Sequence, residues 1–203
     1  LGAKDKKVIA VSEFMRSLLE EQKITCNIVI NNPIDLKVFS PAKNSDRNNE
    51  FLFVGRYDYL AKGFDILENL ARQKLKITCY TNHEASIENL SFKPMIKNKE
   101  LPLVFNSFKF LIFPSRFESF GMVTAEAMAC GLPVLVHPVG IGHELAKNIP
   151  EFVVEDFFNQ EVLINKIKHI TKNYEHYAEL ARMYAENNFS FEKFESQWME
   201  VLK

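Results

Sequence analysis

The sequence lacks the features that mark several common classes of protein. No apolar run approaches the roughly 20 residues that a membrane-spanning helix needs. Lys and Arg number 25 against 26 Asp and Glu, so the net charge of −1 gives no overall attraction to nucleic acid or to an anionic membrane. We therefore expect no transmembrane segment and no nucleic-acid partner. A balanced net charge is still compatible with a local basic pocket.

Cysteine is also scarce. The chain has only Cys26, Cys79 and Cys130, which are too far apart for metal-ligand spacing. An odd number of widely separated cysteines is typical of buried free thiols, and there is no signal-peptide pattern, so we expect a cytoplasmic protein. The chain begins at Leu1 instead of Met, which indicates a fragment or a processed protein.

Several catalytic fingerprints are absent. There is no GxGxxG, no GxxxxGK[ST] and no GxSxG, which argues against a dinucleotide dehydrogenase, a P-loop enzyme and an α/β-hydrolase. No Asp-x-Asp pair is present to hold a metal-bound diphosphate. We therefore expect neither a metal ion nor a bound cofactor.

Glycine is rare, with 7 residues, about half of the usual share of ~7%. Six of these glycines lie beside apolar runs, where a strand meets a loop or a helix ends. This distribution predicts tight turns and close approaches of the backbone instead of flexible linkers. The six are Gly55, Gly63, Gly121, Gly131, Gly140 and Gly142.

Short apolar runs that alternate with helical periodicity dominate what remains. This alternation predicts parallel β-α-β units, and hence a doubly wound, Rossmann-like sheet of the α/β class whose ligands bind at the carboxyl ends of strands. The expected strands are residues 8–11, 28–30, 51–54, 77–80, 108–113, 134–136 and 152–154. The expected helices are one capped by Ser12, then 64–71, 100–105, 121–130, 160–172, 174–187 and 191–202.

The loop after the strand that ends at Val54 carries two cations, Arg56 and Lys62, between Gly55 and Gly63. A guanidinium fork and an ammonium point charge together suit a diphosphate. The alternative is a pair of solvated surface cations. The flanking glycines favour the diphosphate because they let the backbone approach a ligand closely.

A second loop joins the 108–113 strand to the next helix. Free backbone N–H groups at Phe120, Gly121 and Met122 would favour an anion, because the start of a helix is electrically positive. Glu118 on this loop and Glu126 in the helix are suited to accept hydrogen bonds from the paired hydroxyls of a ribose or hexose. The alternative is that both carboxylates are solvated, but the apolar neighbours of Glu126 favour a ligand.

At this point the motifs resemble a known family. Glu118 and Glu126, with seven residues between them, are similar to the signature of retaining glycosyltransferases with the two-domain GT-B fold. The run from Pro114 to Val134 resembles the nucleotide-sugar site of glycosyltransferase family 4, and residues 54–64 resemble its diphosphate loop. The resemblance extends over nearly the whole chain, through residues 8–12, 31–35 and 189–194.

That resemblance implies a transferase that moves a hexose from a UDP or GDP sugar to an acceptor with retention of configuration and without a metal ion. Arg56, Lys62 and Glu118 would serve catalysis, the cations on the diphosphate and Glu118 positioning the sugar. Met95 and Ile96 would contact the base. The implied substrate-binding residues are Gly55, Arg56, Lys62, Met95, Ile96, Glu118, Ser119, Phe120, Gly121, Met122, Val123 and Glu126.

The resemblance also implies the organisation of the chain. Residues 1–27 would end an N-terminal domain and join the two domains, 28–187 would bind the donor, and 188–203 would form a helix crossing back. The acceptor-binding domain would precede Leu1 as the partner of this chain, together with any peripheral membrane attachment. We therefore expect a protein of glycan biosynthesis that is inactive as this fragment.

Two alternatives stay open. One is a non-catalytic nucleotide-sugar-binding module, against which stands the intact set of Arg56, Lys62, Glu118 and Glu126. The other is an enzyme similar to sugar phosphorylases, for which no lysine in a pyridoxal-phosphate context gives support.

Overall fold

The computed structural model describes residues 7–43, 47 and 49–203. Within these residues, five parallel strands form the main sheet. Their order is β5 (Leu90–Pro94), β4 (Ile77–Thr81), β3 (Asn49–Val54), β6 (Phe108–Phe113) and β7 (Val134–Val136). Because β3 is central and the later strands are added on both sides of it, the sheet is doubly wound. The predicted α/β class is confirmed.

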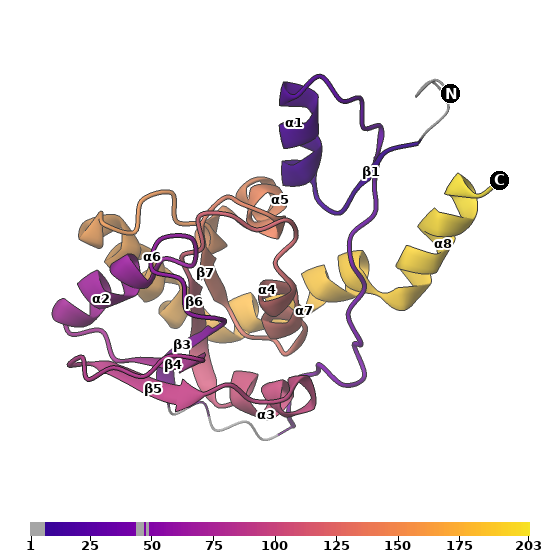
Figure 1. The fold of residues 1–203 in the computed structure, drawn as a ribbon. Coiled ribbons are helices and arrows are strands. Elements are labelled where there is room, and N and C mark those ends of the chain that lie inside the picture. Colours follow the sequence, from indigo (N-terminus) through magenta and orange to yellow (C-terminus); the bar gives the residue numbers. More distant parts are fainter. Residues whose placement is uncertain (1–6, 44–46, 48) are drawn as a thin grey trace.

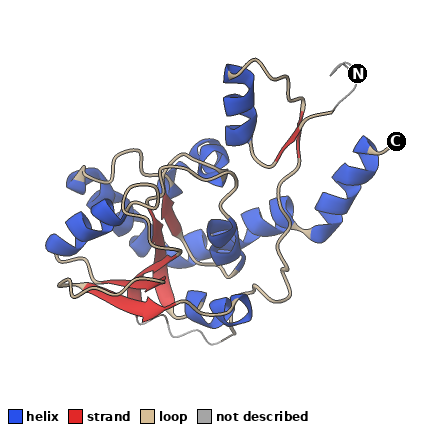
Figure 2. Ribbon diagram, in the orientation of Figure 1, coloured by secondary structure: helices blue, strands red, loops and turns tan. Residues whose placement is uncertain are grey.

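Helices cover both faces of this sheet, as Figures 1 and 2 show. Right-handed crossovers that leave β3 in opposite directions place their helices on opposite faces. The helices are α2 (Phe64–Arg72), α3 (Leu101–Phe105), α4 (Met122–Ala129), α5 (Ile141–Asn148), α6 (Gln160–Lys172) and α7 (Tyr174–Phe189), with 3₁₀ turns η2 (Asn98–Glu100) and η3 (Pro150–Phe152). Among the described residues, none of the helices is long and apolar enough to cross a membrane.

Aromatic side chains fill the core below the carboxyl ends of β3 and β6. The Phe53 ring stacks on Phe113, with centroids 5.5 Å apart, and meets Phe64 edge to face at 4.9 Å. All three side chains are buried. Such a rigid layer fixes the points at which the two loops leave the sheet.

A smaller unit lies beside the main sheet. Strand β1 (Ile9–Ala10) pairs in parallel with β2 (Ile28–Val29), and α1 (Glu13–Glu21) connects them. Helix α8 (Phe191–Val201) extends toward the same side (Figure 1), where the Lys7 ammonium donates to the Val201 carbonyl at 2.7 Å. The first and last described segments therefore meet.

One expected strand is absent from the structure, and one strand in the structure was not expected. Residues 152–154 do not form a strand, because Pro150 begins the η3 turn and only Val153 bridges to Val136. Strand β5 was not predicted, because only Leu90 of its five residues is buried, so no apolar run marks it. The predicted N-cap is correct, since Ser12 Oγ accepts the N–H of Met15 at 3.1 Å.

Candidate functional site

The loops that follow β3 and β6 are fastened to each other. The Arg116 N–H donates to the Ala61 carbonyl at 2.9 Å, and Ser115 Oγ donates to the same oxygen at 3.0 Å. The Arg116 guanidinium also forks onto Asp65 at the start of α2, at 2.8 and 2.6 Å, and this pairing holds the pKa of Asp65 below its usual range. This clamp was not predicted, because Arg116 and Asp65 lie 51 residues apart in the chain.

Gly63 permits the close approach of these two loops. Its backbone is left-handed, with φ 74°, and a Cβ there would lie 2.3 Å from the Pro114 carbonyl oxygen. Only glycine avoids both the conformational strain and the collision. The close approach predicted from the scarcity of glycine occurs at this position.

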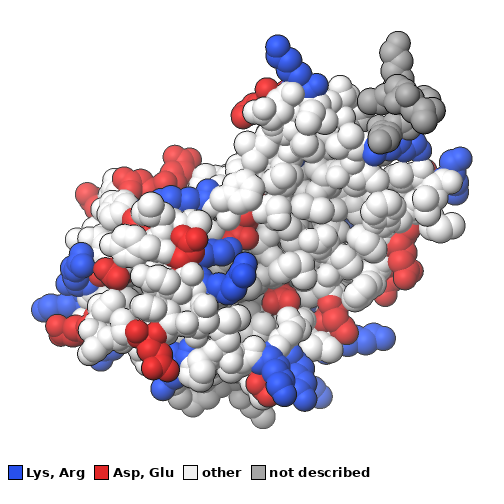
Figure 3. Space-filling view, viewed as in Figure 1, with Lys and Arg blue, Asp and Glu red and all other residues white. Residues whose placement is uncertain are grey.

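Within the joined loops, the structure brings Lys62 and Glu118 together. Lys62 Nζ lies 2.5 Å from Glu118 Oε1 and 5.6 Å from the centre of the Phe113 ring. Arg56 is exposed and makes no ion pair with another described residue. Figure 3 shows Lys and Arg side chains gathered near the middle of this face, with acidic side chains next to them. The site therefore has one cation engaged with a carboxylate and one open to solvent.

Helix α4 begins at this pair with unsatisfied donors. Gly121 is its N-cap, and the N–H groups of Phe120, Gly121 and Met122 donate to no other residue that the structure describes. The Phe120 side chain is buried against Phe189, so this residue offers only its backbone to a ligand. Ser119 and Met122 are exposed and Val123 is half-buried. The helix start is thus positive and open on one side.

Glu126 lies further along α4 and is only 5% exposed. Its Oε1 accepts a hydrogen bond from Asn98 Nδ2 at 2.9 Å. Asn98 was not predicted as a site residue, because it lies on the connection between β5 and α3, where no local pattern marks it. On the same connection, Met95 is exposed and Ile96 packs against the core.

The loop after β4 contacts the loop after β3 through an aromatic stack that was not predicted from the sequence. The Tyr57 N–H donates to Asn82 Oδ1 at 2.8 Å, and the Tyr57 ring stacks on His83 with centroids 3.9 Å apart. In the sequence, the only sign of this stack is an aromatic residue, Tyr57, within a charged loop. This stack fixes the residue that follows Arg56.

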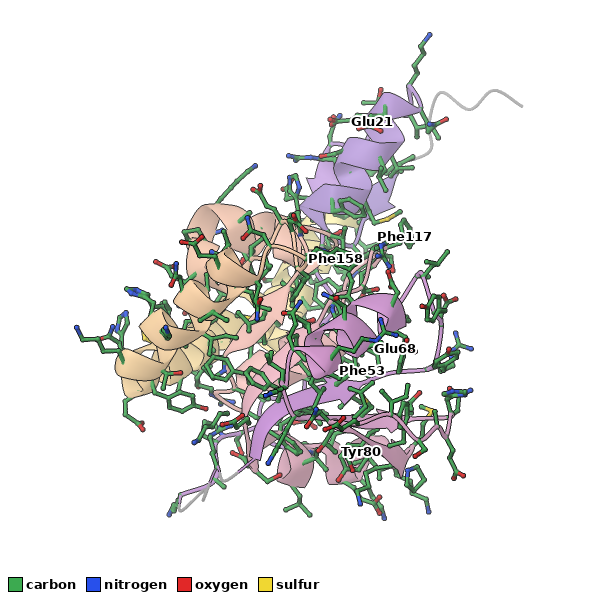
Figure 4. All side chains as sticks on the ribbon, turned by 90° about the vertical axis from the view of Figure 1, so that its left-hand side faces the viewer. Glu21, Phe53, Glu68, Tyr80, Phe117 and Phe158 are labelled. Atoms are coloured by element: carbon green, nitrogen blue, oxygen red, sulfur yellow. The ribbon has the colours of Figure 1, made fainter. Side chains whose placement is uncertain are left out.

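The N-terminal segment rests on the loop that carries Glu118. Ser12 Oγ donates to the Ser119 carbonyl at 2.6 Å, and the Phe14 ring lies 6.1 Å from that of Phe117. Figure 4 shows Phe117 between α1 and α2. The Glu13 N–H donates to Glu144 Oε1 at 2.9 Å, which ties α1 to α5.

Burial of the charged Glu126 carboxylate should destabilise the folded chain at neutral pH. Desolvation raises its pKa above the usual 4.5, and the Asn98 hydrogen bond opposes this only in part. The pKa of Glu126 is higher in the folded chain than in the unfolded chain, so protonation of this carboxyl stabilises the fold. This stabilisation is complete below about pH 4.5, the unfolded pKa, and is lost as pH rises through the folded pKa. We expect Glu126→Gln to melt at a higher temperature than the wild type at pH 7 and equally at about pH 4. If the variant and the wild type melt at the same temperature at pH 7 as well as at about pH 4, burial does not destabilise the charged carboxylate. Thermal denaturation followed by circular dichroism measures this.

Comparison with protein-family models and with known sequences finds glycosyltransferases in both cases. The family model described as Glycosyl transferases group 1 matches residues 36–189. An uncharacterized glycosyltransferase of Methanocaldococcus jannaschii is 30% identical over 200 residues, which cover 92% of this chain and 54% of the relative. The chain thus spans about half the length of that relative.

Solved structures share the fold at lower identity. Sucrose-phosphate synthase from Thermosynechococcus elongatus superposes with a TM-score of 0.77 at 22% identity, over 96% of this chain and 57% of the other. Anabaena HepE, determined in complex with UDP-glucose, gives a TM-score of 0.77 at 20% identity, over 97% of this chain and 63% of the other. Among the described residues, no three His, Cys, Asp or Glu side chains are grouped to hold a metal ion.

Proposed function

Since the chain belongs to the Glycosyl transferases group 1 family and has the GT-B type of α/β fold, we propose that it is the donor-binding part of a hexosyltransferase that uses a UDP or GDP sugar. One observation carries the proposal. The clamp between the loops after β3 and β6 places Lys62 2.5 Å from Glu118, beside the open start of α4. A cation, a hydroxyl acceptor and free N–H donors are thus gathered at one edge of the sheet.

The diphosphate of the donor would lie against Arg56, Lys62 and the start of α4. Charge-assisted hydrogen bonds from the two side chains and the dipole of the helix all favour an anion there. As the bond between sugar and phosphate breaks, negative charge grows on the leaving diphosphate. The same donors would stabilise that charge without a metal ion, because they are already in place before the reaction.

The two glutamates would recognise hydroxyl groups. Glu126, largely buried beside Asn98, would accept from the ribose. Glu118, held by Lys62, would accept from the transferred sugar and orient it. A carboxylate paired with a lysine in this way is suited to positioning, in keeping with transfer that retains configuration.

The rest of the enzyme is proposed to lie outside this chain. The chain covers 54% of its M. jannaschii relative, which leaves room for an acceptor-binding domain. The HepE complex with UDP-glucose makes a UDP sugar the first donor to test. We expect the isolated chain to bind nucleotide without transferring sugar.

A binding screen tests the proposal. UDP or GDP at about 100 times its Kd should stabilise the chain by about 2.7 kcal/mol and raise its melting temperature by roughly 5–10 °C. The same shift is expected in EDTA, since the protein supplies the positive charge. A shift that EDTA abolishes would contradict the proposed metal independence, and no shift with UDP, GDP, ADP or their sugars would contradict donor binding. Unliganded chain with and without EDTA is the control.

A further inference from the structure

Asn98 occupies a defined place although it lies on a connection. It begins the η2 turn, which is closed by the Glu100 N–H donating to the Lys97 carbonyl at 2.9 Å. The Glu100 carboxylate in turn accepts the Lys97 N–H at 3.3 Å. Leu101, the next residue, is buried and begins α3. The turn is therefore anchored at its end, and it directs the Asn98 amide toward α4.

The two oxygens of Glu126 differ in their surroundings. Oε1 accepts from Asn98 at 2.9 Å, whereas Oε2 has no hydrogen-bond partner in the described parts of the chain. A buried carboxylate without donors tends to take up a proton, and a protonated carboxyl is a poorer acceptor for hydroxyl groups. A donor on one oxygen favours the charged form and fixes the orientation of the other oxygen.

We propose that Asn98 is a positioning residue for Glu126, whose amide fixes Oε1 and leaves Oε2 to accept a ribose hydroxyl of the nucleotide donor. This inference rests on the proposed function, in which Glu126 binds the ribose. It assigns a role to a connection that carries no sequence motif, and it makes nucleoside recognition depend on both α4 and the η2 turn.

The other ionisable groups near Glu126 are placed differently. Cys130 lies at the end of α4, where Arg47 donates to its carbonyl at 2.9 Å. Arg182 of α7 donates to the Ala129 carbonyl. The η2 turn adds Lys97, Lys99 and Glu100, all exposed. Within the described structure, Asn98 alone donates a hydrogen bond to the Glu126 carboxylate.

Asn98→Leu tests the role, because it keeps most of the side-chain volume and removes the donor. We expect about 10-fold weaker binding of uridine and of UDP, and unchanged binding of inorganic pyrophosphate, which has no ribose. Lys99→Ala, an exposed neighbour on the same turn, is the matched control and should bind all three probes like the wild type. Titration calorimetry measures each affinity. Uridine affinity in Asn98→Leu equal to that of the wild type would overturn the proposal.

Asn98→Asp gives a second, independent test. At neutral pH two adjacent carboxylates repel each other, so uridine should bind weakly. As pH falls, a proton shared by the pair restores a donor to Glu126, and uridine binding should strengthen before it is lost at lower pH. The wild type should only weaken as pH falls. If Asn98 had a purely structural role, the pH dependence of uridine affinity would have the same sign in Asn98→Asp as in the wild type. Parallel pH profiles of the two proteins would therefore overturn the proposal, even if Asn98→Leu does not fold.

A measurement without ligand separates this inference from the proposed function. The carboxyl carbon of Glu126, followed by NMR in isotope-labelled protein, should titrate at a higher pH in Asn98→Leu than in the wild type. An unmoved midpoint would overturn the role of Asn98 even if the wild type binds UDP. A raised midpoint in a chain that binds neither uridine, UDP nor pyrophosphate would instead overturn the donor site, and the ribose contact with it.

Discussion

Replacing Arg56 or Lys62 by Ala should weaken UDP binding about 10- to 150-fold while leaving uridine binding unchanged. Each substitution removes a charge-assisted hydrogen bond of roughly 1.5–3 kcal/mol to phosphate, at about 1.4 kcal/mol per factor of ten in affinity. Uridine has no phosphate and should not respond. Titration calorimetry with both ligands measures the difference. UDP affinities like that of the wild type in both variants would refute the assignment of the diphosphate to this loop.

The two cations should differ in their effect on stability. Arg56 is exposed and without an ion-pair partner among the described residues, so Arg56→Ala should melt like the wild type. Lys62 lies 2.5 Å from Glu118, and its removal leaves that carboxylate without its counter-ion. Lys62→Ala should therefore also lower the melting temperature.

Glu118→Ala is the informative companion variant. It removes the carboxylate that occupies Lys62, so UDP should bind at least as tightly as to the wild type. The UDP sugar should lose affinity relative to UDP, because its hexose has lost an acceptor. Equal losses for UDP and the UDP sugar would contradict the placement of Glu118 at the sugar.

Gly63→Ala should destabilise the chain by about 2–5 kcal/mol and abolish UDP binding. The new Cβ meets the Pro114 carbonyl oxygen at 2.3 Å, and the left-handed φ of 74° adds strain. The backbone must shift to relieve the collision, which separates the loops that bring Lys62 and Glu118 together. Urea denaturation measures the loss of stability, and calorimetry measures the loss of binding.

Gly121→Ala is the matched control for this collision. Its φ of 101° also disfavours a side chain, but the nearest atom to a Cβ there, Thr124 Oγ1, is 3.7 Å away. This variant should therefore show only the strain, about 1–3 kcal/mol. A Gly121→Ala loss as large as that of Gly63→Ala would show that backbone strain, and not the contact with Pro114, dominates at Gly63.

How far the sequence predicts the fold depends on the kind of element. The buried strand Phe108–Phe113 and the capped helix after Ser12 were predicted because their signals are apolar runs and a local hydrogen bond. Strand Leu90–Pro94 escaped prediction because it lies at the edge of the sheet, where most of its side chains are exposed. Pairing with β4 makes it a strand, and pairing is not a local property.

The sequence by itself determined the doubly wound class of the sheet and the two charged loops, because apolar periodicity and position at a strand end can be read from neighbouring residues. Only the tertiary structure decided the partners within the site. Lys62 meets Glu118 across 56 residues of chain, and Asn98 meets Glu126 across 28. Both contacts depend on parallel strands that end at one edge of the sheet, and the first depends also on Gly63, which lets two backbones approach closely. Neither condition can be read from the residues that make the contact.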